Sequence, residues 1–125
     1  MQINPNSPVL IFQQIMDGVC AAIAAGVYRP GEMVPSVRQQ AVALVVNPNT
    51  VQRAYEQLER DGLLVSRRGS GMEVAAGAPE RAGRRMKDAV ATAFGAGIRA
   101  GAAAGMTGAE INALYRKAWD ERDKS

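Results

Sequence analysis

The chain has 125 residues, of which 47% are apolar and 22% are charged, with 15 Lys and Arg against 12 Asp and Glu. This composition is typical of a globular protein, and a chain of this length can bury a stable core without a disulfide or a bound metal ion. It contains no His and one Cys, which excludes a His-dependent triad, a His-ligated zinc site, a CxxC pair and an internal disulfide. We therefore expect no enzyme activity, no cofactor and no metal.

The chain shows neither a secretion signal at its N-terminus nor an apolar run of about 18 residues that would span a membrane. We expect a cytoplasmic protein with no membrane contact. The net charge of +3 is weak guidance to a partner, because residues 1–75 hold six basic and six acidic side chains. Two segments, 33–55 and 62–72, carry arginines and no carboxylate before Glu56 and Glu73. These segments are predicted to be locally cationic.

The first predicted helix begins near Ser7, which can cap it with Pro8 at the first helical position. The apolar residues that recur at helical spacing are Phe12, Ile15, Met16, Val19, Ile23 and Val27. Cys20 lies beside this stripe, and we interpret it as a packed small residue, with a redox sensor as the alternative. Arg29–Glu32 then has Pro and Gly at the central positions of a type II turn.

A helix-turn-helix is predicted next. Ser36 and Gln39 have the spacing of a capping box, so a second helix begins at Ser36 or just after it. Asn47 is a good cap for a third helix that starts at Pro48 and ends before Gly62. The side chains that this third helix is expected to bury are Val51, Ala54, Tyr55 and Leu58. Two short helices with a tight break between them make the motif.

Residues 63–68 and 72–75 are predicted as two short strands joined by the glycine-rich turn 69–71. Helices followed by a hairpin are typical of a winged helix, so we assign residues 1–75 to a winged helix-turn-helix domain. Residues 76–80 are predicted as a linker.

The C-terminal residues 81–125 are predicted to form a two-helix dimerisation hairpin with little core of its own. Its first helix covers 81–104, and a capping box at Thr107 starts the second. Glycine costs about 1 kcal/mol per helical position relative to Ala, so the first of these helices needs a partner packed against it. Its larger apolar residues are expected to be core or dimer contacts, with a small-ligand pocket as the alternative.

Candidate nucleic-acid contacts follow from the residue types. Amides, hydroxyls and guanidinium groups at a helix start match the donors and acceptors of base edges and phosphates. The third helix supplies this set through Asn49, Thr50, Gln52 and Arg53. Arg38 and the free backbone N–H groups in the first turn of the second helix, which follows Ser36, favour a phosphate contact. Arg67, Arg68 and Gly69 can reach a neighbouring groove. The alternatives are a solvated polar surface and a hairpin whose glycines serve only the turn.

Taken in order, these motifs resemble the GntR family of bacterial transcription regulators over about residues 8–75. The segments that carry the resemblance are Pro30-Gly31, Pro35–Arg38, Val46–Tyr55, Leu58-Glu59, Asp61–Leu64 and Arg68–Gly71. The run Val46–Val51 and the short tail are similar to the YtrA subfamily. That similarity implies a mainly helical fold with one small hairpin: an N-terminal winged helix-turn-helix and a C-terminal two-helix appendage used for dimerisation.

The resemblance also implies site residues. The DNA contacts it implies are Arg38, Asn47, Asn49, Thr50, Gln52, Arg68 and Gly69. The residues expected at the dimer contact are Met86, Val90, Phe94, Gly97, Ile98, Gly101, Ile111, Leu114, Tyr115 and Trp119. The chain departs from the family at Pro48 and Gln52, where many members carry Arg, and at Glu73, where many carry an aromatic residue.

We therefore expect a homodimeric transcription regulator, more specifically a repressor of its own operon, that binds a two-fold double-stranded DNA operator. The subfamily resemblance implies an ABC transporter operon as the target. An unknown small-molecule effector is expected, if one exists, at the dimer junction near Phe94, Tyr115 or Trp119. The alternative function is a winged-helix module that binds another protein through the same surface.

Overall fold

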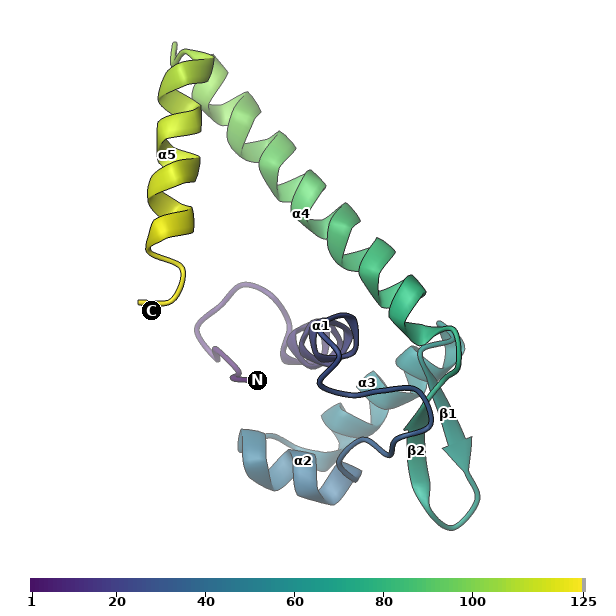
Figure 1. The fold of residues 1–125 in the computed structure, drawn as a ribbon. Coiled ribbons are helices and arrows are strands. Elements are labelled where there is room, and N and C mark those ends of the chain that lie inside the picture. Colours follow the sequence, from purple (N-terminus) through teal and green to yellow (C-terminus); the bar gives the residue numbers. More distant parts are fainter. Residues whose placement is uncertain (125) are drawn as a thin grey trace. The chain divides into compact units, whose positions relative to one another are not determined.

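Figure 1 shows the computed structural model of the chain, which describes residues 1–124. Its elements in chain order are α1 (Ile11–Ala24), α2 (Val37–Leu44), α3 (Pro48–Arg60), β1 (Leu64–Arg67), β2 (Gly71–Val74), α4 (Ala78–Ala103) and α5 (Gly108–Asp120). This confirms the predicted class, a mainly helical fold whose N-terminal part is a winged helix-turn-helix. Within the described residues, none of the helices has the length and apolar character that a membrane span needs.

The chain divides into two units, which we call the head, Met1–Lys87, and the tail, from Asp88 on. The core of the head forms where α1 packs against α3. The buried residues of these two helices are Ile15, Met16, Val19, Cys20 and Ile23 of α1, and Val51, Ala54, Tyr55 and Leu58 of α3. Complete burial of one such large apolar side chain contributes about 1.5–3 kcal/mol. The apolar residues at the predicted helical spacing therefore make the α1–α3 contact that mainly stabilises the head.

The predicted start of α1 is wrong. The helix begins at Ile11, and Leu10 precedes it without a side-chain cap. The Ser7 hydroxyl instead accepts a hydrogen bond from the Val9 N–H, which stabilises a turn in place of a helix. The Gln14 side chain bonds to the Asn4 backbone and to the Val9 carbonyl, and these bonds hold the preceding segment in a loop.

The turn and the cap that precede α2 are confirmed. Gly31 has φ +85°, which a type II turn requires, and the Glu32 N–H donates to the Arg29 carbonyl at 3.0 Å. The Ser36 hydroxyl accepts from the Gln39 N–H at 3.1 Å, and the Gln39 side chain accepts from the Ser36 N–H at 2.9 Å. This reciprocal pair satisfies two backbone donors at the start of a short helix.

The break between α2 and α3 passes through Val45, which ends α2 in the left-handed conformation with φ 55° and ψ 54°. The Asn47 side chain then accepts from the Asn49 N–H at 2.8 Å, and Pro48 occupies the first helical position, as predicted. At the other end of α3, Gly62 has φ +80°, a conformation that glycine adopts without strain. Both ends of α3 are thus determined by residues beside them in the chain.

The hairpin pairs β1 with β2 in an antiparallel register that places Leu64 opposite Val74. A third segment, which the sequence does not reveal as a strand, adds to it. Met33 forms an isolated bridge with Glu73, and the Val34 N–H donates to the Met72 carbonyl at 3.0 Å. The strand β2 is therefore held on both edges.

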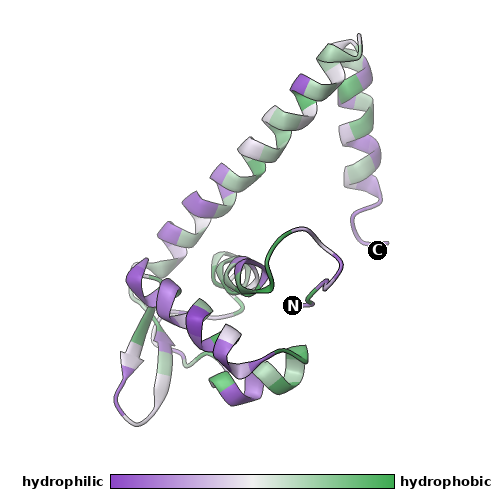
Figure 2. Cartoon of the chain, turned by 180° about the vertical axis from the view of Figure 1, so that it is seen from behind, coloured by the Kyte–Doolittle hydropathy of each residue, from purple (hydrophilic) through white to green (hydrophobic). Residues whose placement is uncertain are grey.

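The helix α4 begins at Ala78, inside the segment that is predicted as a linker, and both Ala78 and Ala82 are part of the head core. Figure 2 shows hydrophilic residues in the first turns of α4 that give way to more apolar ones further along. In the tail, the Thr107 capping box that starts α5 is confirmed, with the Glu110 N–H donating to the Thr107 hydroxyl at 3.1 Å.

Candidate nucleic-acid interface

The outer face of α3 presents polar side chains in one row. Asn49, Gln52, Arg53 and Glu56 follow each other at helical spacing and are all exposed, while the opposite face of the helix is buried in the core. Thr50 is half-buried at the edge of this row. The row begins at the N-terminal end of α3, which is the end that a helix-turn-helix places against base edges.

The side chains of this row differ in how they are held. The Gln52 amide donates to the Glu56 carboxylate at 3.0 Å, and the Arg53 guanidinium lies over the Phe12 ring, 5.0 Å from its centroid. The Asn47 side chain is engaged in capping the helix. Among the described residues, the Asn49 side chain makes no hydrogen bond, so its amide is available to a ligand.

A buried tyrosine fixes α3 against the segment that leads into α2. The Tyr55 hydroxyl donates to the Pro35 carbonyl at 2.7 Å. Burial, assisted by Tyr28, raises the pKa of Tyr55 above its usual range, so the hydroxyl remains a donor. This bond sets the first turn of α2 beside α3. Arg38 on that turn is exposed and has no ion-pair partner within residues 1–124.

A hollow of about 340 Å³ lies between the start of α2, the face of α3 and the hairpin. Predicted DNA-binding residues that line it are Ser36, Gln52, Arg67, Arg68 and Gly69. The structure therefore brings together residues from three separate parts of the chain. The other predicted residues, Arg38, Asn47, Asn49, Thr50 and Arg53, do not line this hollow.

The two arginines of the hairpin have different surroundings. Arg67 forms an ion pair with Glu73 across the hairpin, and this contact raises the pKa of the guanidinium. Arg68 lies in the turn and makes no ion pair with a described residue. The two acidic residues that contact this site, Glu56 and Glu73, are absent from the predicted DNA-binding residues. Only Glu56 could have been found by spacing, since it stands four residues after Gln52 on one helix.

The end of α3 is tied to the start of α4 within the head. The Arg85 guanidinium donates to the Asp61 carboxylate at 2.9 Å. Cys20 is buried beneath these residues, and burial raises the pKa of its thiol although Arg85 opposes the shift. The burial supports the interpretation of Cys20 as a packed residue, since a raised pKa lowers the thiolate fraction that reacts with oxidants.

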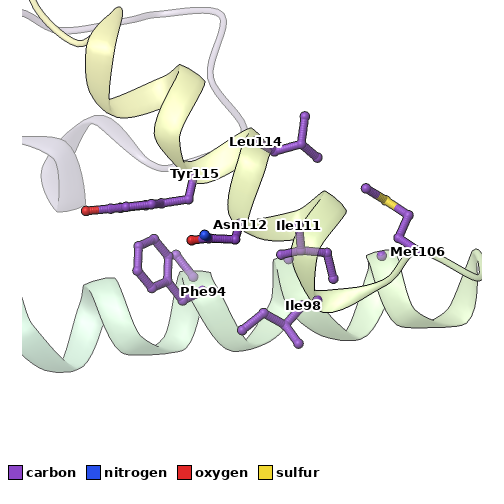
Figure 3. Close-up of a pocket in the computed structure, with 11 residues that line it drawn as sticks. Phe94, Ile98, Met106, Ile111, Asn112, Leu114 and Tyr115 are labelled. Atoms are coloured by element: carbon purple, nitrogen blue, oxygen red, sulfur yellow. The ribbon is translucent and has the colours of Figure 1, made fainter.

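The tail carries an apolar groove between α4 and α5, with a volume of about 660 Å³. Figure 3 shows Phe94 and Ile98 of α4 facing Ile111 and Tyr115 of α5. The Phe94 and Tyr115 rings meet edge to face at 6.1 Å, and the Tyr115 ring stacks with that of Trp119. No residue of α5 is buried.

The predicted dimer residues occupy different environments. The large apolar ones that remain exposed are Val90, Phe94, Ile98, Leu114, Tyr115 and Trp119. Met86 instead packs against the head core. Gly101 is buried within the tail, where a Cβ would lie 3.0 Å from the Ile111 side chain, so glycine permits the close approach of α4 and α5 there.

Comparison with known proteins gives a consistent result. The family model described as bacterial regulatory proteins, gntR family, matches residues 12–74. The HTH-type transcriptional repressor YtrA of Bacillus subtilis is 41% identical over 71 residues, which are 57% of this chain and 55% of that protein. The chain spans about half the length of the curated relatives that it matches first.

Two solved structures resemble the chain over nearly its whole length. A GntR family transcriptional regulator from Listeria monocytogenes superposes with a TM-score of 0.73 at 28% identity, covering 92% of this chain and 98% of that one. YtrA from Sulfolobus acidocaldarius, a GntR-family transcription factor, has a TM-score of 0.59 at 28% identity and covers 97% of both chains.

Proposed function

Because this chain belongs to the GntR family of bacterial regulatory proteins, we propose that it acts as a transcriptional repressor that places the first turns of α3 in the major groove of an operator. The observation that carries the proposal is the exposed polar row on α3 that begins at Asn49, together with the exposed Arg38 on the first turn of α2 and Arg68, which lines a hollow with Gln52. These three side chains make no hydrogen bond or ion pair with any of residues 1–124, so binding DNA costs them no internal contact.

In this proposal the contacts divide by chemistry. Arg38, Arg68, the free N–H groups of the α2 turn that follows Ser36, and the backbone at Gly69 bind phosphates, which supplies affinity that falls with salt. Asn49 and Gln52 contact base edges, where each good bidentate pair discriminates by about 1–3 kcal/mol. Asn47, Thr50 and Arg53 are assigned contacts beside the groove, whereas Arg67 is paired with Glu73 on the hairpin.

We further propose that the active form is a homodimer joined through the tail. Large apolar side chains such as Leu114, which is 56% exposed, and Trp119, which is 52% exposed, line one face of α5. A monomer rarely leaves a continuous apolar patch of this kind in water, and a second copy is the partner that a symmetric operator requires. Half-site centres are then expected about 34–36 Å apart, or a multiple of that distance.

The proposal is tested with fragments selected from the native genome by the purified full chain, followed by affinity measurements on the strongest fragment. Arg38→Ala should weaken binding to all sequences and lower the slope of log affinity against log salt by about 1.8 for the dimer, which is about 0.9 per chain. Asn49→Ala should instead relax the preference for the selected site over a mutated one, at a cost of about 1–3 kcal/mol.

Arg99→Ala in the tail serves as the matched control, because it removes the same charge outside the head and should leave the salt slope unchanged. Circular dichroism confirms that each variant keeps its helices. Unchanged affinity of Arg38→Ala at fixed salt would count against its phosphate contact. If the wild-type chain selects no fragment at low salt, the protein-binding alternative replaces the proposal.

A further inference from the structure

Two neighbouring cations of the hairpin are held differently. The Arg67 guanidinium reaches one oxygen of Glu73 with two nitrogens, Nε at 2.6 Å and Nη2 at 2.5 Å. Arg68, the next residue, forms no ion pair within the described part of the chain. Charge-assisted hydrogen bonds of this kind are stronger than neutral ones, so Arg67 is held along the hairpin while Arg68 stays available.

The pairing follows from the register of the two strands. Glu73 stands opposite Val65, and Arg67 is two residues further along the same face of β1, which makes the pair a diagonal cross-strand contact. Glu73 is the better fixed of the two partners, because β2 is also bonded to the segment around Met33. Its side chain is 18% exposed, against 57% for Arg67.

We propose that Glu73 sets the affinity of the hairpin for DNA by neutralising Arg67, so that Arg68 is the cation that the hairpin offers to phosphate. This inference rests on the proposed DNA-binding function. The Arg67–Glu73 pair has no net charge, so bringing it to DNA releases few counterions, whereas an uncompensated arginine releases about 0.9 per phosphate contact. Moving Arg67 from Glu73 to a phosphate would also leave the carboxylate beside a polyanion.

The test measures binding of the full chain to a fluorescein-labelled duplex of arbitrary sequence, about three helical turns long, by anisotropy between about 50 and 200 mM salt. Glu73→Gln removes the neutralising charge from both chains of the proposed dimer, so its salt slope should exceed that of the wild type by about 1.8, which is about 0.9 per chain. Over this fourfold salt range the binding of the dimer then weakens about 12-fold more than that of the wild type. Arg68→Ala should lower the slope by about 1.8 for the dimer, since each chain loses one phosphate contact.

The double variant Arg67→Ala with Glu73→Gln is the decisive comparison, because it deletes the pair without changing the net charge of the hairpin. It should match the wild type in both affinity and slope. Glu121→Gln at the end of α5 controls for the change in total charge and should leave the slope near that of the wild type. Thermal unfolding monitored by circular dichroism establishes that the hairpin variants remain folded.

Two results would overturn the inference while leaving the proposed function intact. The double variant could lose slope and affinity as Arg68→Ala does, which would mean that Arg67 itself contacts phosphate. Alternatively, Glu73→Gln could behave as Glu121→Gln does, which would mean that Glu73 neutralises nothing relevant to DNA. Failure of the wild-type chain to bind any duplex would instead overturn the proposed function together with this inference.

Discussion

At the scale of single residues, the polar face of α3 combines side chains that are free with side chains that must give up a contact to bind DNA. Gln52 donates to Glu56, and Arg53 lies over the Phe12 ring. Exposed contacts of these kinds are each worth about 0.2–1 kcal/mol. A good bidentate base contact is worth more than that, about 1–3 kcal/mol, so the exchange remains favourable for the correct sequence.

Val45 has a left-handed backbone conformation that its β-branched side chain disfavours. It is the one residue other than glycine with positive φ among those described, and its side chain is 89% exposed, so packing does not compensate the strain. A β-branched residue in this conformation is an outlier, and the left-handed form costs about 1–2 kcal/mol. Val45→Asn should therefore raise the free energy of unfolding by about 0.5–1 kcal/mol, because Asn tolerates this conformation.

Urea unfolding at a fixed protein concentration measures this difference. Val42→Asn is the matched control, because Val42 of α2 is also highly exposed, at 75%, but has ordinary helical geometry, and Val and Asn have similar helix propensity. Its unfolding free energy should change little. Equal effects at the two positions would show that exposure of an apolar side chain, and not backbone strain, explains any gain at Val45.

At the scale of elements, two helices begin with reciprocal capping boxes that lie entirely within four residues of the chain. In α2 the pair is Ser36 and Gln39, and in α5 it is Thr107 and Glu110. The α5 cap matters more to its helix, since α5 has no buried residue to hold it in place within the chain. A helix without such burial depends on its caps and on a partner.

The α5 cap predicts a pH dependence. Hydrogen bonds from the Thr107 backbone and hydroxyl lower the pKa of Glu110 below its ordinary value of 4.5. Because the pKa is lowered in the folded state, the stabilisation is complete above that ordinary value and is lost as the pH falls through the lowered one. Wild type should therefore have a higher thermal midpoint than Glu110→Gln near neutral pH, and the difference should disappear in acid.

The comparison with Glu110→Gln isolates this carboxyl from all others that titrate in the same range. Gln at this position keeps the reciprocal hydrogen bonds but not the charge that favours a helix N-terminus. Circular dichroism melts at a series of pH values provide the measurement. A difference between the two proteins that stays constant from neutral pH into acid would contradict the assignment.

At the scale of the whole molecule, the chain consists of a head with a conventional core and a tail that leaves much of its apolar surface exposed. The head buries residues from α1, α3 and the hairpin around one centre. In the tail, the Tyr115 ring contacts those of Phe94 and Trp119, yet each of the three residues remains about half exposed. We therefore expect the assembly of two chains to depend on the tail and not on the head.

Leu114→Glu tests this expectation. Leu114 lines the apolar groove but takes no part in the contacts between the aromatic rings, so its replacement should leave the hairpin of α4 and α5 formed. We expect wild type to be a dimer and Leu114→Glu a monomer, measured by light scattering after size exclusion. Loss of the second half-site contact should reduce the affinity for a two-fold operator about a hundredfold or more.

Ala113→Glu is the matched control, since position 113 lies on the opposite side of α5 from the stripe of Ile111, Leu114 and Tyr115. It introduces the same charge one residue away and should remain dimeric. If both variants stay dimeric, the dimer contact lies outside this groove. If wild type is itself a monomer at the concentrations used for DNA binding, the proposed two-fold arrangement is wrong.

The sequence by itself determined the features that depend on a few consecutive residues. The capping boxes, the type II turn at Gly31, the cap at Asn47 and the end of α3 before Gly62 all appear as predicted, because each is a bond or a backbone preference within about four positions. The buried stripe of α3 followed from its period, since one helix face must leave water. The ordered motifs also sufficed to indicate the family.

Tertiary structure decided whatever depends on residues that are distant in the chain. The loop that displaces the start of α1 away from Ser7 exists because Gln14 bonds back to Asn4. Glu73 pairs with Arg67 only through the strand register, and the bridge from Met33 fixes it there. A local sequence pattern does not predict such partners. The charge and size of a side chain do not determine which residue from a distant part of the chain the fold places next to it.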